Sequence, residues 1–506
     1  MNWEQLISSK RLRQSNADGN RKNMSNQLDT RNPFESDFGR VVFSAASRRL
    51  HDKTQVFPLT SDDNIHSRLT HSMEVMNIGL SFSIYLCSNE DFQKHTGLSE
   101  IEILRKINPI LKTACLVHDI GNPPFGHFGE EVFQDYFLDL ITDIKAILAG
   151  TQVTNQIANC IYESLDEDQK KETLSILNKN EIIDDYIHFD GNAQGLRVLN
   201  KLQYLGDLYG LNLTYGTLAA TLKYPNFGSP EKDGSIAKHK HGVFYTEKES
   251  VKLIAKDCGM LLPDETIIRH PLAFLMEAAD SICYLVMDIE DAISKNWLSS
   301  NTVENMIKEC PNIEEKVINK LINNRDINKG LDGPSMKDWV MMRTTLLSHL
   351  MEVATNNFIN HLSDIEKGNY NEELIEDGDG VYSVLKSLTN QYVLKRREII
   401  SLEITGRAVI NGLFDSYLTM LFHKNKKVRS RAKSLISKSI LKTVLHEHLK
   451  EKNPEISGND VDCAYKDWDV KDFSVEERFR LIRDYVACMT DKFALTQYQK
   501  ISGQKI

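Results

Sequence analysis

Long apolar runs are absent from this sequence. No stretch of eighteen apolar residues occurs, so we predict no transmembrane span. The first six residues, Met1 to Leu6, lack the basic-then-apolar pattern of a secretory signal. Paired cysteines are also absent: the eight cysteines are scattered without a C-x-x-C motif, mostly in apolar, helix-like surroundings. This usage is typical of reduced thiols rather than of disulfides or a zinc knuckle, and it predicts a cytoplasmic protein.

Glycine-rich nucleotide loops and internal repeats are missing too. The chain has no P-loop and no G-x-G-x-x-G motif, and few segments alternate apolar and polar residues as strands do. We therefore predict an all-α fold. Positive charge is not in excess: the formal net charge of −10 over 506 residues argues against general nucleic-acid coating but allows a local basic patch. The 41% apolar and 26% charged composition is that of a soluble protein with a large core.

The most informative stretch is residues 115–131. An apolar helix should end at His118 and Asp119, because the Gly-Asn-Pro-Pro run that follows cannot continue a helix. A second tight loop, Gly-His-Phe-Gly, carries His127 and leads to Glu130. A His–Asp pair at a helix end, beside a second His and Glu, indicates a metal-ligand pair next to an acid–base pair. For the dipeptide alone, a buried hydrogen-bonded His–Asp pair is the favoured interpretation, so the surrounding residues decide.

Two further predicted helices carry polar residues on one face. The first runs from about Ile65 to Cys87, is capped by residues 62–64, and places Arg68 and His71 on the same face. Taken alone, His71 is interpreted as a polar residue on a half-buried helix, which is favoured over a metal ligand.

The second helix spans residues 270–290. Asp280, Tyr284 and Asp288 recur at every fourth residue, so they project from one face over about two turns. Their neighbours are apolar, which predicts a central helix. Two interior carboxylates cost free energy unless they bind a cation or a polar ligand. The alternative, a salt-bridged inward face, requires buried basic partners.

Other segments give coarser predictions. Residues 1–33 are polar and are expected to be extended or mobile. Further helices are predicted at 41–50, 98–117 and 130–141, and breaks in the C-terminal third at 330–334 and 376–380.

Two basic stretches have open roles. A loop ending near Gly242 contains His239-Lys-His241. Phosphate binding by the lysines of this loop is favoured over metal binding by its histidines. Between Lys424 and Lys438 there are seven basic residues and no acidic one. A solvated basic helix is slightly favoured there, and a phosphate-facing, nucleic-acid-facing or subunit-contact surface is the alternative.

The candidate metal ligands form one set: His71, His118, Asp119 and Asp280. Two imidazoles and two carboxylates suit Mn²⁺, Mg²⁺, Fe²⁺ or Ni²⁺ better than a thiolate-loving ion. A histidine on one helix, a His–Asp pair and a later helical aspartate make an H…HD…D pattern.

Several phrases of the sequence carry a family resemblance. They are Lys53–Pro58, Arg68–Val75, His118–Glu130, Gly191–Gly195, Leu222–Tyr224, Met276–Asp280, Asp484–Tyr485 and Ala487–Asp491. With the H…HD…D pattern, they resemble the bacterial dGTP triphosphohydrolases (dGTPases) of the HD-domain phosphohydrolase superfamily. The similarity covers most of the chain, from about Phe34 to Tyr498.

The resemblance implies a reaction. Family members hydrolyse dGTP, or other dNTPs, to deoxynucleoside and tripolyphosphate by water attack at the α-phosphorus. The expected cofactor is a divalent metal, Mg²⁺ or Mn²⁺. By the same resemblance, His127 donates a proton to the leaving 5′ oxygen or positions the attacking water. Glu130 then orients His127 and stabilises its charge.

Substrate contacts are implied in the same way. Tyr284 matches a tyrosine under the deoxyribose that leaves no room for a 2′-OH. The other expected contacts are Arg68, Lys223 and Tyr224 with phosphate, Gln55 and Asp288 with the sugar 3′-OH, and Asn192 in the same pocket.

The resemblance also implies an organisation. We expect an HD-domain helical bundle with an additional helical C-terminal region: a polar segment at 1–33, the catalytic core at 34–300, and residues 301–506 packing on the core and on neighbouring subunits. Relatives form hexamers, so a homo-oligomer is expected, with single-stranded DNA as a further partner and no membrane. An arginine near the C-terminus can complete a neighbouring site; the candidates are Arg429, Arg431 and Arg483.

Two other functions stay open on sequence grounds. A phosphohydrolase of the same superfamily acting on a different nucleotide should lack Gln55, Lys223-Tyr224 and the Tyr284/Asp288 pair. A nucleotide-sensing DNA-binding regulator is supported only by the basic run 424–438.

Overall fold

The chain folds as an assembly of helices. The computed structural model describes residues 1–15, 29–55, 57–59, 65–231, 234–311, 313–322, 336–376 and 380–504. Within these ranges there are many helices and three isolated β-bridges but no strand, so the predicted all-α fold is confirmed. None of the described helices is long and apolar enough to cross a membrane.

The helices that carry or flank the predicted polar residues are α5 (Arg68–Ser88), α8 (Asn108–Val117), α9 (Gly126–Leu148), α13 (Gly191–Arg197), α14 (Tyr215–Thr221) and α16 (Pro271–Ser294). The other helices that begin before residue 300 are α1 (Trp3–Leu6), α2 (Leu12–Ser15), α3 (Pro33–Val42), α4 (Ala45–Arg49), α6 (Glu90–Thr96), α7 (Glu100–Glu102), α10 (Gln156–Ser164), α11 (Glu167–Leu177), α12 (Asn180–Ile187) and α15 (Lys248–Asp257). From residue 300 on they are α17 (Ser300–Glu309), α18 (Glu315–Ile322), α19 (Met336–Asn360), α20 (Leu362–Lys367), α21 (Val381–Tyr392), α22 (Arg397–Leu421), α23 (Lys426–Leu435), α24 (Lys438–Lys452), α25 (Gly458–Asp467), α26 (Val475–Ala487) and α27 (Asp491–Ile501). Short 3₁₀ or π segments are η1 (Leu50–Asp52), η2 (Ile103–Ile107), η3 (Val198–Leu202), η4 (Ile236–Lys238), η5 (Tyr245–Glu247) and η6 (Val470–Asp472).

Capping residues correct several predicted boundaries. Ser67 caps α5 with a capping box, so the helix expected from Ile65 begins at Arg68; the predicted cap at 62–64 lies outside the described residues. The single helix predicted at 41–50 is wrong, because Ser44 starts a new helix, α4, after α3 has ended.

The N-terminal segment is not extended or mobile over its first fifteen residues. Trp3 and Leu6 of α1 are buried, and the Trp3 indole donates to Glu366 (2.7 Å). That prediction was wrong because it weighed the polar composition of residues 1–33 and not these two apolar anchors. The predicted break at 330–334 and most of that at 376–380 lie outside the described residues.

The start of α9 differs from the prediction in a way that matters for chemistry. Residues 126–129 were expected to form a loop, but they are the first turn of α9. Phe125 precedes this turn with a left-handed backbone (φ 65°), and its N–H donates to Asp491 (2.9 Å). This contact, remote in sequence, lets the helix begin early. His127 and Glu130 therefore lie on one helix face.

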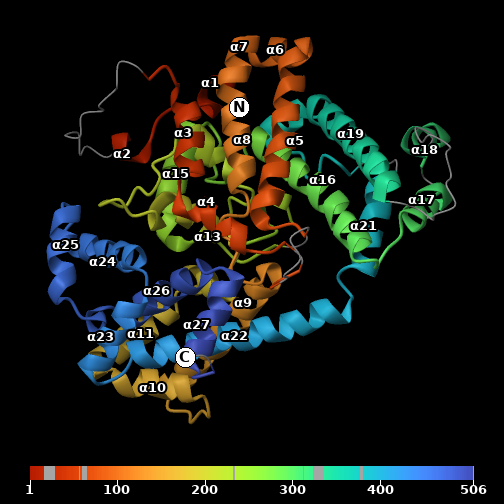
Figure 1. The fold of residues 1–506 in the computed structure, drawn as a ribbon. Helices are drawn as coiled ribbons and strands as arrows, with labels where there is room; N and C mark the ends of the chain where they lie inside the picture. Colours follow the sequence, from red (N-terminus) through yellow and green to blue (C-terminus); the bar gives the residue numbers. More distant parts are fainter. Residues whose placement is uncertain are drawn as a thin grey trace.

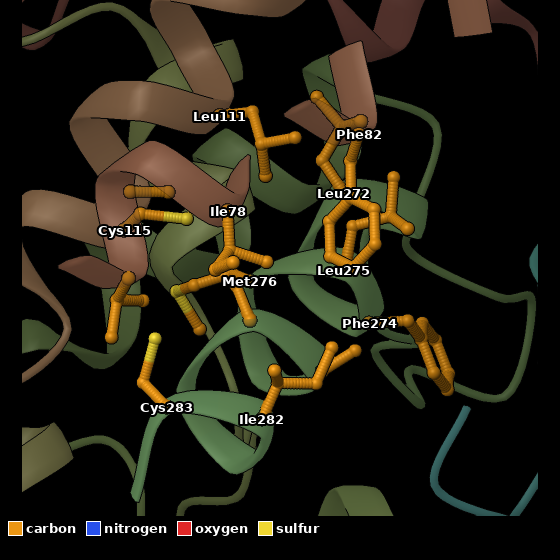
Figure 2. Close-up of a cluster of buried hydrophobic side chains, with 14 of the residues drawn as sticks. Ile78, Phe82, Leu111, Cys115, Leu272, Phe274, Leu275, Met276, Ile282 and Cys283 are labelled. Carbon is orange, nitrogen blue, oxygen red and sulfur yellow. The ribbon is translucent and has the colours of Figure 1, made fainter. Parts of the chain in front are cut away.

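Two apolar clusters flank the loop between α8 and α9. The first is built around α5, α8, α16 and α19; Figure 2 shows Ile78 of α5, Cys115 of α8 and Met276 of α16 converging in it. The second is built around α9, α22 and α26, and the rings of Phe137 and Phe414 lie 5.1 Å apart there. The α5, α8, α16 and α19 helices and the α10, α22, α23 and α26 helices occupy opposite sides of the molecule (Figure 1). Residues 118–125 thus lie at the junction.

Candidate active site

Three helices bring the predicted metal ligands together. Ligand atoms of His71 on α5 and of His118 and Asp119 after α8 all lie within 4.8 Å of one another. Asp280 on α16 is not in this group of three, but its Oδ1 lies 3.1 Å from His71 Nε2 and 3.4 Å from His118 Nε2. All four residues thus surround one small space. The His71 side chain is 1% exposed.

The histidine of the His–Asp pair has a fixed tautomer. His118 Nδ1 donates to the Cys115 carbonyl (2.7 Å), so in the neutral ring Nε2 carries the lone pair. That Nε2 atom is buried and has no hydrogen-bond partner among the described residues. It lies 3.4 Å from Asp280 Oδ1, so it holds either a proton, as the raised pKa of this ring indicates, or a cation between the imidazoles and carboxylates.

Charges in this group depend on one another. Burial opposes a charged His118, but the carboxylates of Asp119 and Asp280 outweigh it and raise the His118 pKa to about 9. Burial also opposes ionisation of Asp119, yet Arg68 and His118 hold its pKa below the ordinary value. The Asp280 pKa is likewise lowered, mainly by His118. The group therefore holds two carboxylates that need positive charge, which suits a divalent metal.

A second charged pair stands on α9. His127 Nδ1 lies 3.0 Å from Glu130 Oε2, while Glu130 Oε1 accepts from the Gly191 N–H (2.8 Å). Burial opposes the charge on Glu130, but His127 and Lys240 lower its pKa to about 2. Glu130 in turn raises the pKa of His127. The His127 side chain is 75% exposed and Glu130 7%, so a buried carboxylate holds an accessible imidazole.

Glycines let the central loop approach its neighbours. A Cβ on Gly121 would clash with backbone atoms of Gly191 and Gly195, so the loop packs directly on the start of α13. Gly126 has a left-handed backbone (φ 61°), and a Cβ there would lie 2.6 Å from the Arg68 guanidinium. These close contacts explain why glycine occupies positions 121 and 126 of the His118–Glu130 phrase.

Arg68 and Lys223 supply cations beside the ligand group. Arg68 Nη1 donates to Asp119 Oδ2. Lys223 Nζ lies 3.7 Å from Asp280 Oδ2 and 3.5 Å from Glu277 Oε1. Burial opposes the Lys223 charge, but neighbouring Tyr224, Glu277 and Asp280 raise its pKa. The salt-bridged face considered for α16 is therefore partly present.

The predicted sugar contacts have less complete surroundings. Asp288 is buried, and no ion pair reaches it within the described ranges; burial and Asp291 raise its pKa to about 8. Tyr284 is half-buried one turn away from Asp280. Gln55 Oε1 is buried without a described hydrogen-bond partner. The Asn192 side chain donates to Asp190 (2.8 Å).

The sequence analysis missed Lys240 as an individual site residue. Its Nζ lies 2.9 Å from Asp190 Oδ2 and 3.8 Å from Glu130 Oε2. The adjacent His241 is buried against Asp185 (3.0 Å) and fixes the loop. The only sequence signal that pointed to Lys240 was its place in the lysine-rich loop, for which we predicted phosphate binding.

The C-terminal basic residues are largely engaged within the chain. Arg429 forms two hydrogen bonds with Asp469 (2.7 and 2.8 Å), and Arg483 is fully buried beside Asp484. Neither guanidinium is free to reach a neighbour in this arrangement. Arg431 is exposed on α23.

Comparisons with known proteins agree with the sequence resemblance. A family model described as a phosphohydrolase-associated domain matches residues 438–500. A Listeria innocua protein named deoxyguanosinetriphosphate triphosphohydrolase-like protein is 31% identical, over 99% of this chain and 100% of its own length. Proteins named deoxyguanosinetriphosphate triphosphohydrolase from Cronobacter sakazakii and Yersinia pestis are each 31% identical, over 92% of this chain and 93% of theirs. The resemblance is confirmed: this chain belongs to the deoxyguanosinetriphosphate triphosphohydrolase family of hydrolases.

Proposed function

We propose that the protein is a metal-dependent triphosphohydrolase that converts dGTP to deoxyguanosine and tripolyphosphate. The observation that carries this proposal is the unpartnered, buried Nε2 of His118 among His71, Asp119 and Asp280, next to the His127–Glu130 pair. Relatives that match nearly the whole chain have names that state this activity. Action on the other dNTPs is part of the same proposal.

The proposed metal ligands are His71, His118, Asp119 and Asp280. Bound there, Mg²⁺ or Mn²⁺ would act as a Lewis acid toward the α-phosphate. Arg68 and Lys223 would bind the remaining phosphate charge from beside Asp119 and Asp280, and Lys240 from beside Glu130.

His127 would transfer the proton. As water oxygen bonds to the α-phosphorus, the bond between phosphorus and the 5′ oxygen breaks, and that oxygen takes a proton from His127. Glu130 favours the protonated imidazole and fixes the ring through Nδ1, which leaves Nε2 toward the exposed side. Positioning of the water by His127 is the alternative role.

Sugar selection would rest on α16. Tyr284 would pack under the deoxyribose and exclude a 2′-OH, while Asp288 and Gln55 would bind the 3′-OH. Asn192, Tyr224 and their surroundings complete the proposed pocket. The buried Gln55 Oε1 has no described hydrogen-bond partner, and the buried Asp288 has no ion pair among the described residues, which supports this role.

Product analysis tests the proposal. Purified protein with Mg²⁺ or Mn²⁺ would receive each dNTP and GTP separately, and ion-exchange chromatography would resolve nucleoside, diphosphate and tripolyphosphate. We expect deoxyguanosine plus tripolyphosphate from dGTP, with GTP untouched. His127→Ala should lower kcat by about 10²- to 10⁴-fold. Equal turnover of all dNTPs would withdraw the dGTP preference, and no release with metal bound would refute the hydrolase assignment.

The assembly, location and DNA partner stay predictions. Light scattering would test the homo-hexamer, and a salt-dependent binding titration would test single-stranded DNA. The alternative of a nucleotide-sensing regulator would gain if His127→Ala left the cellular role intact.

A further inference from the structure

A buried lysine lies beside the loop between α8 and α9 without a carboxylate partner. Lys53 is 2% exposed, and within the described ranges it forms no ion pair. Its Nζ instead donates to two backbone carbonyls, that of Asn122 and that of Ala487 (3.1 Å). A buried ammonium with only neutral acceptors is costly, and burial lowers the pKa of Lys53 to about 8. Such a cost is typical of a functional position rather than of a packing position.

The first of these carbonyls belongs to the turn that carries a proposed metal ligand. The Asn122 N–H donates to the Asp119 carbonyl (3.2 Å) and closes this turn. The Asn122 side-chain Nδ2 donates to Asp119 Oδ1 (2.7 Å), while Arg68 donates to the other oxygen, Oδ2. Asn122 is buried, and its Oδ1 occupies the space that a Cβ on Gly191 would need. Each oxygen of the Asp119 carboxylate therefore has a donor that is itself held in place.

The second carbonyl belongs to the C-terminal region. Ala487 is the last residue of α26 and lies in the segment that the phosphohydrolase-associated model matches. The last four carbonyls of a helix have no partner within the helix, so the end of α26 offers Lys53 a free acceptor. The same helix is fixed by Asp484, which pairs with Arg197 of α13 (2.7 Å). Lys53 thus connects an anchored helix end to the turn that holds Asp119.

We propose that Lys53 is a positioning residue for the metal ligand Asp119 and acts through Asn122. Its ammonium, anchored on the end of α26, fixes the Asn122 carbonyl, and the Asn122 amide then fixes the carboxylate of Asp119. Groups that hydrogen-bond a ligating carboxylate orient it, and the loss of one costs about 10- to 100-fold in metal affinity. This role of Lys53 rests on the metal site of the proposed function, and it makes the C-terminal region a contributor to that site.

Titration of the full chain with Mn²⁺, followed by isothermal titration calorimetry, tests this role without any turnover. Lys53→Met removes the ammonium, and Asn122→Ala removes the amide but keeps the backbone carbonyl that Lys53 contacts. Each variant should bind Mn²⁺ about tenfold more weakly or worse. Both residues act on one carboxylate through a single chain of hydrogen bonds. The double variant should therefore bind about as weakly as the weaker single variant, and not with the two losses multiplied.

Lys433→Met is the matched control. The Lys433 Nζ also donates to two backbone carbonyls, those of Tyr465 (2.6 Å) and Trp468 (3.0 Å), but it lies on α23 and contacts no residue of the candidate active site. Its loss should leave the Mn²⁺ affinity unchanged, and circular dichroism would confirm the folding of every variant.

Three results would contradict the role of Lys53. Unchanged Mn²⁺ affinity in folded Lys53→Met or in folded Asn122→Ala would overturn it while leaving the proposed function intact. Losses that multiply in the double variant would show that the two residues act independently, which also overturns it. No Mn²⁺ binding by the wild type would overturn the proposed metal-dependent function and the role of Lys53 together.

Discussion

At the scale of single residues, the His127–Glu130 pair combines one buried and one accessible partner. Glu130 is nearly inaccessible and stays ionised because His127, Lys240 and the Gly191 N–H face it. His127 is accessible, and its pKa lies above the ordinary value because of Glu130. A proton donor of this kind works at pH values below its own pKa, so the raised pKa extends activity toward alkaline pH.

Removal of the Glu130 charge should therefore move the pH profile. In Glu130→Gln, the pKa of His127 falls, and the alkaline limb of kcat/KM should shift to lower pH. The profile would be measured between about pH 5 and 10 at saturating metal. A lower rate with an unmoved alkaline limb would show that His127 does not carry the transferred proton.

Asp288 gives a prediction for stability instead. Its folded pKa of about 8 exceeds the ordinary value of 3.8, so folding favours the protonated form. Stability from this group is complete at low pH and declines as pH rises through this interval, by at most about 1.4 kcal/mol per pH unit. The unfolding free energy of Asp288→Asn minus that of the wild type, measured by urea denaturation, should therefore be larger at pH 8 than at pH 5. Exposed Asp467→Asn is the control; an equal difference at both pH values would contradict the buried neutral carboxyl.

At the scale of elements, sequence patterns predicted the positions of helices better than they predicted the contacts made at the helix ends. The spacing on α16 and the His–Asp pair predicted which side chains would meet, because periodicity fixes a helix face. The first turn of α9 was missed, because Phe125 is held by Asp491, far away in the chain. Lys240 was missed for the same reason: its position depends on buried His241 and Asp185.

Asp491 is the clearest element-scale test. Its carboxylate accepts from the Thr54 N–H (3.0 Å), the Thr54 hydroxyl (2.7 Å) and the Phe125 N–H (2.9 Å). It therefore ties α27 to the loop that carries Gln55 and to Phe125, which precedes the first turn of α9 with His127. Asp491→Asn places an amide donor against one of these donors, so we expect misplaced loops and a kcat/KM loss of up to about 10²-fold. Steady-state kinetics would show this loss, with Asp467→Asn unchanged; wild-type kinetics in folded Asp491→Asn would contradict it.

At the scale of the whole molecule, the apolar clusters do not follow the predicted regions. The first cluster includes Trp3 and Ile399, and the second joins 125–193 to 409–494. The division into 1–33, 34–300 and 301–506 stays a prediction about organisation. We propose that these regions unfold together, because each cluster contains side chains from both the core and the C-terminal region.

Arg197 at the end of α13 joins these regions by charge. It is fully buried and contacts Glu247 (2.9 Å), Glu447 of α24 (3.1 Å) and Asp484 of α26 (2.7 Å). Glu447 and Asp484 belong to the segment matched by the phosphohydrolase-associated model, so this cation connects that segment to the helix that begins beside Glu130. The Asp484 of the C-terminal phrase thus has a structural role that the sequence alone did not reveal.

Arg197→Met should destabilise the whole molecule rather than one region. Three buried carboxylates would lose their shared cation, and breaking a buried pair costs about 3–5 kcal/mol. Arg407→Met removes an exposed pair with Asp135 (3.0 Å) and should cost at most about 1 kcal/mol. Urea unfolding followed by both circular dichroism and intrinsic fluorescence would measure the two losses. If the circular dichroism and fluorescence transitions coincide and both shift in Arg197→Met, the molecule unfolds cooperatively. If two separate transitions appear and only one of them shifts, the C-terminal region unfolds on its own.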